Sequence, residues 1–520
     1  ELTDAVVQLD VPLKDLKKEM SLPLYKAFGV DTNAGVVHQD EDFMTLINRM
    51  ERPEKIDFEL PEDLTATLRP YQETGYKWLK GLDHYGFGGI LADDMGLGKT
   101  LQVISFIAGS LGKGDTKPYL VICPSSVLYN WQKEFQQFAP DIKTRLITGM
   151  KSERRDTIAT AIAENIPVWI TSYPLLQRDE DLYEGLAFRT VILDEAQSVK
   201  NATAKTTKAA SALNANNKIA LSGTPVENAL SELCTIFSIA QPGLFGTKKD
   251  FKQMDPAQIA KKVKPFILRR LKADVLKDLP PKIESISYIE MTEKQKTVYL
   301  SQLQLMRQET KEMLDADTLN ENRIKILAGL TRLRQICCDP ALVMADYTGG
   351  SGKLDRLMEY LAEAKENGRR VVLFSQFTQM LAIIREKLDE TSEAYFYLDG
   401  QTPNQDRLAL TTRFNEGEKD LFLISLKAGG TGLNWTGGDA VILYDSWWNP
   451  AVESQATDRV HRFGQKKVVQ VVRLIATGTI EERINELQAK KREMIDSVIQ
   501  AGGQSVTSLS KEELMQLLEI

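Results

Sequence analysis

The chain has 520 residues, of which 42% are hydrophobic and 26% are charged, and its formal net charge is −7 at pH 7. This composition is typical of an ordinary folded protein of about three domains, and the absence of any apolar run near roughly 20 residues argues against a membrane protein. The negative charge argues against a protein that coats DNA by bulk charge, but not against one that grips DNA locally in a cleft.

Residues 1–64 form a polar, partly amphipathic segment without a recognisable motif, and we interpret them as an N-terminal accessory segment. The chain begins with Glu1 rather than Met, and its start lacks the charged-then-apolar pattern of a signal peptide. We therefore expect the chain to be part of a longer protein.

Residues 65–290 alternate short apolar runs of β-type residues with helical patterns. This alternation is typical of a parallel sheet whose strands are joined by helices in right-handed βαβ units. We interpret the region as the first of two α/β lobes, with strands at 89–92, 119–123, 168–171, 190–193 and 218–221.

The loop after the first strand, residues 93–100, is called the phosphate loop below and reads Asp93-Asp94-Met95-Gly96-Leu97-Gly98-Lys99-Thr100. A loop between a strand and a helix directs backbone N–H groups toward phosphate, and glycines let the backbone approach closely. Lys99 would reach the β- and γ-phosphates of a nucleotide, and the Thr100 hydroxyl would bind Mg²⁺. The usual pattern has a further glycine where this chain has Asp93.

The strand at 190–193 ends in two adjacent acids, Asp194 and Glu195. The carboxyl edge of a parallel sheet would bring them beside the phosphate loop. Asp194 would hold Mg²⁺ through water, and Glu195 would orient and deprotonate the attacking water. Ser222-Gly223-Thr224 ends another strand and could hydrogen-bond these acids. Together these residues predict an ATP-hydrolysing site.

Residues 291–346 are predicted to be a helical insertion, with an apolar face made by Ile324, Leu327, Leu330, Leu333 and Ile336. Cys337 and Cys338 are interpreted as buried helix residues rather than a strained vicinal disulfide. Four cysteines without metal-ligand spacing fit free thiols in a reducing compartment, so we expect a cytoplasmic or nuclear protein rather than a secreted one. The glycine-rich segment 347–352 is predicted to be a hinge or linker.

Residues 347–478 repeat the alternation of the first lobe and are predicted to form a second parallel sheet. Its strands are expected at 370–374, 394–398, 421–424, 440–444 and 468–475. Residues 479–520 are predicted to form a helix and a tail with a final short helix.

Two arginines dominate the segment 455–465 of the second lobe. Arg459 and Arg462 are three residues apart, so we expect one helical face to present both guanidinium groups. A planar, permanently charged group suits the charge that spreads over a transferring phosphoryl group. The glycine-rich loop 426–434 would allow close backbone approach to a phosphate.

The set of motifs from about residue 65 to 480 resembles the SWI/SNF-type ATPases of helicase superfamily two. The resemblance rests on the order and spacing of Leu68-Arg69-Pro70-Tyr71-Gln72, the phosphate loop, Asp194-Glu195-Ala196-Gln197, Ser222-Gly223-Thr224-Pro225, Phe374-Ser375-Gln376-Phe377, Gly429–Asn434, Trp448-Asn449-Pro450 and Gln455–Gln465. Trp435 stands where an aliphatic residue is usual in the family.

The resemblance implies two RecA-like lobes of the P-loop type that bind ATP with Mg²⁺ and move along intact double-stranded DNA without unwinding it. Gln72 would read the adenine edge, Gly432 would also contact the nucleotide, and Arg459 and Arg462 would act as arginine fingers. The helix 481–492 would be a brace that packs back onto the first lobe. Residues expected to face DNA are Ser125, Asn130, Trp131, Ser172, Ser375, Gln376, Lys427, Thr431 and Trp448.

Other functions fit part of the same pattern. An ATPase that recycles RNA polymerase would share these motifs. An RNA helicase fits less well, because the segment 455–465 reads QATDRVHRFGQ rather than HRxGRxGR. An inactive scaffold that only binds nucleic acid is disfavoured by the intact Lys99, Asp194, Glu195, Arg459 and Arg462. We expect a monomer.

Overall fold

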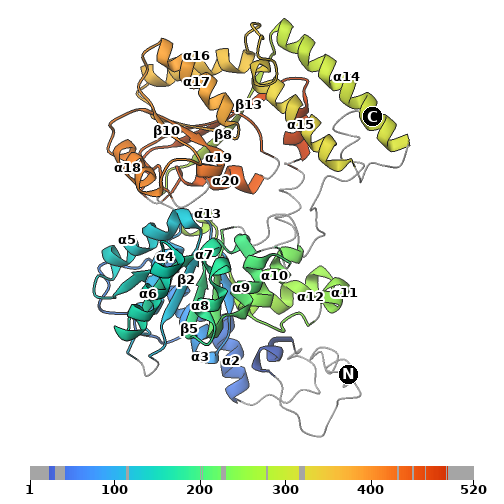
Figure 1. Ribbon diagram of the computed structural model, residues 1–520. Coiled ribbons are helices and arrows are strands. Elements are labelled where there is room, and N and C mark those ends of the chain that lie inside the picture. The colour runs from blue at the N-terminus through green and yellow to red at the C-terminus, as the bar shows by residue number, and fades with distance from the viewer. Residues whose placement is uncertain are drawn as a thin grey trace. The chain divides into compact units, whose positions relative to one another are not determined.

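The computed structural model describes most of the chain as two compact units, which divide between residues 277 and 278 and are called the first and second unit below (Figure 1). The described residues are 23–29, 41–112, 116–199, 201, 203–223, 230–246, 248–276, 279–315, 322–429, 433–447, 450–462, 464–487 and 489. Among the helices of these residues, none combines the length and the apolar character that crossing a membrane requires.

The first unit is built on a seven-stranded sheet in the order β3-β4-β2-β5-β6-β1-β7, with every pair of neighbours parallel. Its central strands are buried along most of their length, as expected for a parallel sheet covered by helices on both faces. The strands are β1 Gly89–Leu91, β2 Tyr119–Cys123, β3 Thr144–Leu146, β4 Val168–Ser172, β5 Ala187–Leu193, β6 Asn214–Leu221 and β7 Ile267–Leu268.

Helices link these strands, as the βαβ pattern predicts. The first of the sheet-packing helices, α3 (Pro70–Tyr85), has proline at its first position and ends at Gly86, whose φ of 67° is readily adopted by glycine. The other helices of the unit are α2 Glu41–Glu51, α4 Lys99–Ala108, α5 Leu128–Phe138, α6 Lys151–Ala163, α7 Tyr173–Arg178, α8 Glu180–Tyr183, α9 Lys205–Ala212, α10 Leu230–Ala240, α11 Lys248–Gln253, α12 Pro256–Val263 and α13 Lys272–Val275.

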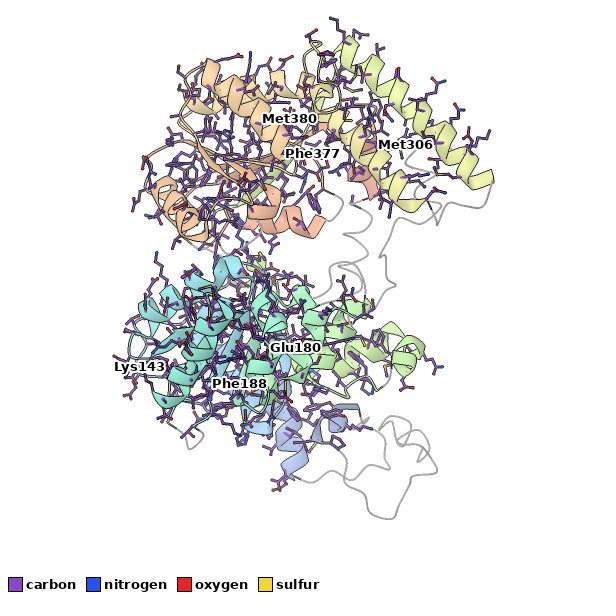
Figure 2. The ribbon with its side chains drawn as sticks, in the orientation of Figure 1. Lys143, Glu180, Phe188, Met306, Phe377 and Met380 are labelled. Carbon is purple, nitrogen blue, oxygen red and sulfur yellow. The ribbon has the colours of Figure 1, made fainter. Side chains whose placement is uncertain are left out.

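The second unit contains a six-stranded sheet in the order β10-β11-β9-β12-β13-β8, again with all neighbours parallel. Alternate residues of its strands point to opposite faces and enter two separate apolar clusters. Met380 of α17 belongs to one cluster and Phe414 of α18 to the other (Figure 2 labels Met380). The strands are β8 Lys282–Ile289, β9 Val371–Ser375, β10 Phe396–Leu398, β11 Leu421–Ser425, β12 Ala440–Leu443 and β13 Val469–Ala476.

The helices of the second unit cover this sheet and extend beyond it. A further apolar cluster joins α14 and α15 to the residues that follow β13, and Met306 of α14 belongs to it (Figure 2). The helices are α14 Glu293–Asp315, α15 Arg323–Cys338, α16 Gly352–Glu366, α17 Thr378–Glu390, α18 Asn404–Asn415, α19 Leu426–Gly429 and α20 Pro450–Asp458.

The parallel sheets and all the predicted strands are confirmed, but three strands were not predicted: β3, β7 and β8. The first two are only three and two residues long. β8 lies at a sheet edge, and most of its side chains are exposed, including Ile283, Ile286 and Tyr288. Its apolar residues do not alternate strictly with polar ones, so the period-two pattern of a half-buried strand is missing. Because β8 pairs with β13, the predicted lobe boundary at 290 is too late by about one strand.

One further prediction about the second unit is wrong in part. On α15, Leu330, Leu333 and Ile336 are buried as predicted, whereas Ile324 and Leu327 are 82% and 44% exposed. The segment 347–352 leads into α16 as a link without helix or strand up to Ser351, whose hydroxyl caps α16 and donates to the carbonyl of Cys338 at 2.6 Å. At the described start of the predicted brace, Ile480 and Ile484 pack with α14 and α15, and the packing of the brace onto the first lobe stays a prediction.

Candidate nucleotide site

The phosphate loop adopts a backbone conformation that depends on glycine. Gly96 and Gly98 have φ angles of 88° and 73°, in the left-handed region. A Cβ atom at Gly98 would lie 2.6 Å from Nε2 of Gln72. That amide donates to the carbonyl of Leu97 at 3.2 Å, while its oxygen accepts from the backbone N–H of Arg69 at 3.0 Å. The loop is therefore fixed against α3 by the side chain that was predicted to read adenine.

The start of α4 presents a positive electrostatic end. Its N-cap is Gly98, and its first turn contains Lys99 but no acidic residue. The first backbone N–H groups of the helix and its dipole therefore favour an anion at this point. The ammonium of Lys99, at the start of α4, donates to the carbonyl of Asp93, at the other end of the phosphate loop, at 2.6 Å.

The two predicted acids lie at the end of β5, beside aromatic residues from two other elements. The indole Nε1 of Trp131, on α5, donates to Oδ2 of Asp194 at 2.8 Å. The hydroxyl of Tyr173 donates to the Asp194 carbonyl at 2.8 Å. Oδ1 of Asp194 accepts from the backbone N–H of Glu195 at 2.9 Å, and Glu195 has a φ of 48°, which is uncommon for a residue with a side chain.

A relay of side chains connects the second acid to the neighbouring strand. Nε2 of Gln197 donates to Oε2 of Glu195 at 2.8 Å, and the Ser222 hydroxyl donates to Oε1 of Gln197 at 3.1 Å. Ser222 follows β6 and is buried. The predicted contact between this serine and the acids is therefore made through Gln197.

The acid pair carries an unfavourable concentration of negative charge. Desolvation and then the charge of Glu195 raise the pKa of Asp194 to about 7, while the Trp131 hydrogen bond and the charge of Lys99 lower it. A divalent cation would relieve this repulsion, and oxygen ligands are the type that Mg²⁺ prefers. The glycine-dependent loop, the open helix start and the acid pair thus fit ATP with Mg²⁺, which would supply charge neutralisation at the phosphates.

The second unit holds the predicted arginines in a turn rather than on a helical face. α20 ends at Asp458, and Arg459 and Arg462 lie in the turns that follow. The Arg459 side chain is buried, whereas that of Arg462 is half-buried and donates to Oδ1 of Asn434. The expectation of one shared face is wrong, because the helix stops one residue before the first arginine.

Trp435 anchors this arginine turn. Its backbone N–H donates to the carbonyl of Arg459 at 2.9 Å, and its buried ring meets Phe374 and Phe422 edge-on at centroid distances of 5.7 and 6.2 Å. Gln465 adds hydrogen bonds from Nε2 to the carbonyls of Gly438 at 2.7 Å and Thr436 at 3.2 Å. The aromatic residue that departs from the family pattern therefore ties the turn to the sheet.

Several residues predicted to face DNA are buried instead. Trp131 and Ser172 are each 1% exposed, and Trp131 contacts Asp194, so these two predictions are wrong. Ser375 is also buried, and its hydroxyl donates to Asp445. Gln376 is half-buried, with its backbone N–H 3.1 Å from Oδ1 of Asp445.

The remaining DNA candidates are only partly described. Ser125 is exposed at the start of the turn before α5, and Asn130 is half-buried with Nδ2 donating to Glu134 at 2.7 Å. Thr431, Trp448 and the Lys427 side chain lie outside the described residues. The predicted nucleotide contact Gly432 and the strand-end residue Thr224 lie outside them as well.

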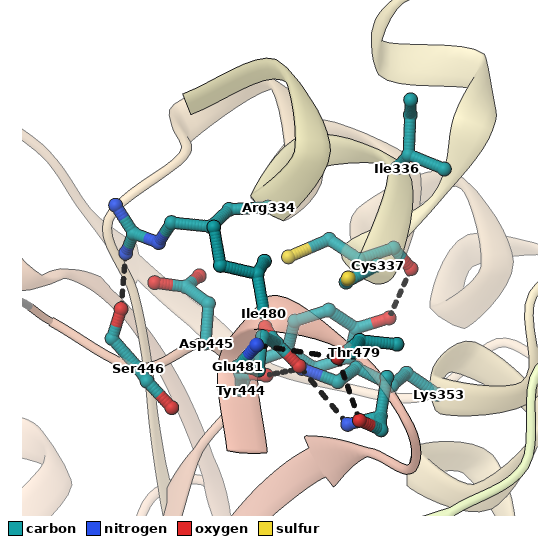
Figure 3. A network of polar contacts seen from close by, with 12 residues as sticks. Arg334, Ile336, Cys337, Lys353, Tyr444, Asp445, Ser446, Thr479, Ile480 and Glu481 are labelled. Carbon is teal, nitrogen blue, oxygen red and sulfur yellow. Dashed lines mark hydrogen bonds and ion pairs between the residues drawn. The ribbon is translucent and has the colours of Figure 1, made fainter. Parts of the chain in front are cut away.

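A buried polar network supports the end of β12 (Figure 3). Arg334 of α15 donates to the carbonyl of Ser446, and the Lys353 ammonium donates to the carbonyl of Tyr444 at 3.0 Å. Lys353 also forms an ion pair with Glu481 at 2.5 Å, in which both side chains are almost fully buried. The network fixes residues 444–446, which lead toward the segment that carries the arginines.

Sequence reasoning missed Gln102 and Arg270, which also contact the site, and it expected Tyr173, next to Ser172, to face DNA rather than to bind the Asp194 carbonyl. The one signal that could have indicated Arg270 is Asp93, because a buried acid in place of a glycine requires a cationic partner. Tyr173 and Gln102 lie in segments with ordinary helical patterns and give no such signal.

Comparisons with known proteins agree with this geometry. The SNF2-related domain matches residues 71–342, more than half of the chain, and the helicase conserved C-terminal domain matches residues 352–464. The chain is 38% identical over 473 residues to a protein of Mycoplasma pneumoniae named as an uncharacterized ATP-dependent helicase, with 89% of this chain and 45% of that protein covered.

Two further relatives extend the comparison. YwqA of Bacillus subtilis, provisionally named as an ATP-dependent helicase/translocase, is 36% identical over 536 residues, which cover 98% of this chain and 58% of YwqA. The ISWI chromatin-remodeling complex ATPase ISW2 of Saccharomyces cerevisiae is 35% identical over 486 residues, which cover 88% of this chain and 43% of ISW2. The chain thus spans about half the length of these relatives. It belongs to the SNF2-related family.

Proposed function

We propose that this chain hydrolyses ATP to ADP and phosphate and uses the reaction to move along double-stranded DNA without separating the strands. Lys99 and the N–H groups at the start of α4 would bind the β- and γ-phosphates, and Thr100 and Asp194 would hold Mg²⁺. Glu195 would accept a proton from the attacking water. Bound Mg²⁺ would neutralise the developing phosphate charge. The remaining predicted nucleotide contacts are Gln72, Asp94, Met95, Gly96, Leu97, Gly98 and Gly432.

One observation carries the hydrolysis part of this proposal. The Lys99 charge acts directly on the Asp194 carboxyl and lowers its pKa, so the phosphate loop and the acid pair face one common region. They do so because β1 and β5 both pair with β6, and the carboxyl ends of parallel strands lie at the same edge. A cationic loop and a carboxylate pair at one edge are what phosphoryl transfer to water requires.

The second unit would contribute the guanidinium groups of Arg459 and Arg462 to the same reaction. Their turn is held to the sheet by Trp435 and Gln465, so the two side chains start from fixed backbone positions. A fixed arginine stabilises transferring phosphoryl charge with little reorganisation. This division of the catalytic groups between two units would let binding of ATP and DNA depend on each other.

The DNA part is supported by the names of the relatives, which include a chromatin-remodeling ATPase. We propose backbone contacts from exposed positions such as Ser125, with no sequence preference, because phosphate contacts position a protein without reading bases. RNA polymerase on DNA is the alternative target.

The proposal is tested by comparing nucleic acids as activators of ATP hydrolysis. Duplex DNA should raise the rate more than single-stranded DNA or RNA do, and the chain should displace the third strand of a DNA triplex without separating a duplex. Activation by RNA alone, or duplex separation, would contradict the translocase part. Activation only by RNA polymerase bound to DNA would favour the recycling alternative.

A further inference from the structure

The phosphate loop has an acid, Asp93, at the position where the usual pattern has its first glycine. The Asp93 side chain is completely buried, and both of its carboxylate oxygens are bound by Arg270. Nε of Arg270 donates to Oδ1 at 2.8 Å, and Nη2 donates to Oδ2. Two parallel hydrogen bonds between a guanidinium and a carboxylate form the strongest arrangement of this type. The pair lies directly before Asp94.

Arg270 also binds two helices that contribute to the nucleotide site. Its Nη2 donates to Oε1 of Gln102, on α4, at 2.7 Å, and its Nη1 donates to the carbonyl of Tyr71, on α3. Gln102 in turn donates from Nε2 to Oδ2 of Asp93 at 3.1 Å. The guanidinium thus joins α3, α4 and the entry of the phosphate loop.

The helix α3 has a glycine where this junction needs room. A Cβ atom at Gly75 would lie 1.8 Å from Oε1 of Gln102 and 2.8 Å from Nη2 of Arg270. A side chain there would displace the arginine or the glutamine. The sequence therefore contains a buried acid, an arginine, an amide and a glycine that fit one another.

The backbone around Arg270 runs along the start of the loop and pairs with it. The N–H of Ala92 donates to the carbonyl of Leu268 at 2.7 Å, and the N–H of Asp94 donates to the carbonyl of Arg270 at 3.0 Å. The N–H of Lys272 then donates to Oδ2 of Asp94 at 3.0 Å. Residues 268–272 thus hold the start of the loop through its backbone and the Asp94 carboxylate.

We propose that Arg270 is a positioning residue for nucleotide binding, which sets the phosphate loop in its phosphate-accepting conformation by neutralising Asp93 and joining it to α3 and α4. The inference rests on the proposed function, because it concerns the same nucleotide site. Arg270 acts through the loop: the carbonyl of Asp93 accepts from the Lys99 ammonium, so a shift of Asp93 moves the group that would bind phosphate. Preorganised groups bind more tightly because less order must be gained on binding.

The test is Arg270→Lys in the full chain, with Arg154→Lys as a matched control. Arg154 and Asp179 form another buried ion pair of the first unit, in which Nη2 of Arg154 lies 2.7 Å from Oδ1 of Asp179. Arg154 lies on α6 and not at the phosphate loop. Lysine keeps the charge but cannot reproduce the planar fork. For the wild type and each variant, two quantities are measured: the dissociation constant of a fluorescent ATP analogue with Mg²⁺, and the free energy of unfolding in urea.

Both variants should lose stability to a similar extent, but only Arg270→Lys should weaken nucleotide binding, by about tenfold or more. Unchanged nucleotide binding by a folded Arg270→Lys variant would overturn the inference, and so would an equal loss in Arg154→Lys. If the wild-type chain binds no nucleotide at all, the proposed function fails, and this inference fails with it.

A second pair of variants keeps the test decisive if Arg270→Lys does not fold. Arg270→Gln leaves the Asp93 carboxylate buried without its cation, whereas the double variant D93N/R270Q removes both charges. The double variant should fold and should bind the nucleotide analogue at least tenfold more weakly than the wild type, because the neutral amides cannot hold the loop as firmly. Wild-type affinity in the double variant would overturn the inference.

Discussion

Replacing Asp194 with asparagine should stabilise the first unit at alkaline pH although it removes a residue of the proposed catalytic set. Desolvation and the neighbouring Glu195 raise the pKa of Asp194 to about 7, so ionising this carboxyl in the folded chain is unfavourable. Asparagine has the same shape and cannot ionise. Its single oxygen can accept from either the Trp131 indole or the backbone N–H of Glu195, so one of these two hydrogen bonds to the carboxylate is lost. Functional sites commonly contain such unfavourable charge clusters.

The size of the effect follows from linkage. The ordinary pKa of an aspartate is about 3.9, so a folded value near 7 corresponds to about 4 kcal/mol of unfolding free energy as an upper limit. Partial exposure of Asp194 reduces the expected gain to about 2–3 kcal/mol. For an acid whose pKa is raised by folding, the favourable contribution is complete below pH 4 and is lost as the pH rises toward 7. The gain from asparagine should therefore be largest at pH 8 and about a third as large at pH 5.

Urea unfolding at the two pH values, with amide hydrogen exchange of peptides from β2 and β5, would report on the first unit. The control is Asp179→Asn, which removes an acid that is ion-paired with Arg154 and should destabilise the unit at both pH values. A variant at Asp194 that gains nothing at pH 8, or gains equally at pH 5, would refute the reasoning about the acid pair.

Further substitutions test the other contacts. Trp131→Phe should weaken Mg²⁺-dependent binding of an ATP analogue about tenfold and leave binding in EDTA unchanged, because it removes a hydrogen bond to a carboxylate; Trp169→Phe, whose indole donates to a backbone carbonyl, should change neither affinity. Arg462→Ala should reduce ATP turnover by a factor of at least about 100 with little change in nucleotide affinity, and wild-type turnover would exclude its role as an arginine finger. Trp435→Leu should destabilise the second unit by about 2–4 kcal/mol in urea unfolding through the loss of buried ring contacts, and a change below 0.5 kcal/mol would show that the ring does not anchor the turn.

Much of the fold was predictable because the strands of both sheets are short, apolar and buried on two faces. Such runs give a strong signal without any knowledge of neighbours. The edge strand β8 gave no clear signal, because its apolar residues Ile283, Ile286 and Tyr288 are irregularly spaced and exposed rather than buried on one face. The pattern of the glycine-rich segment 347–352 indicated a link but not its close packing: a Cβ at Gly352, the first residue of α16, would lie 2.1 Å from the carbonyl oxygen of Glu290.

The site was predictable where a motif lies on one continuous segment. The phosphate loop and the acid pair were identified from local patterns, and the Lys99–Asp194 interaction then follows from strand order. Contacts made by residues distant in sequence were not predictable. Trp131 has the amphipathic surroundings of a surface helix, and only the packing of α5 against β4 and its neighbours directs its indole to Asp194. Arg270 lies 177 residues from Asp93 along the chain.

The most direct test of the central claim is the release of phosphate from ATP by the full chain with Mg²⁺ and duplex DNA, compared with Glu195→Gln. We expect steady turnover by the wild type, stimulated by the DNA, and at least about a hundredfold less by the variant, which binds nucleotide but lacks the carboxylate that accepts the proton of the water. Equal rates for the two proteins, or no release by either, would contradict the account.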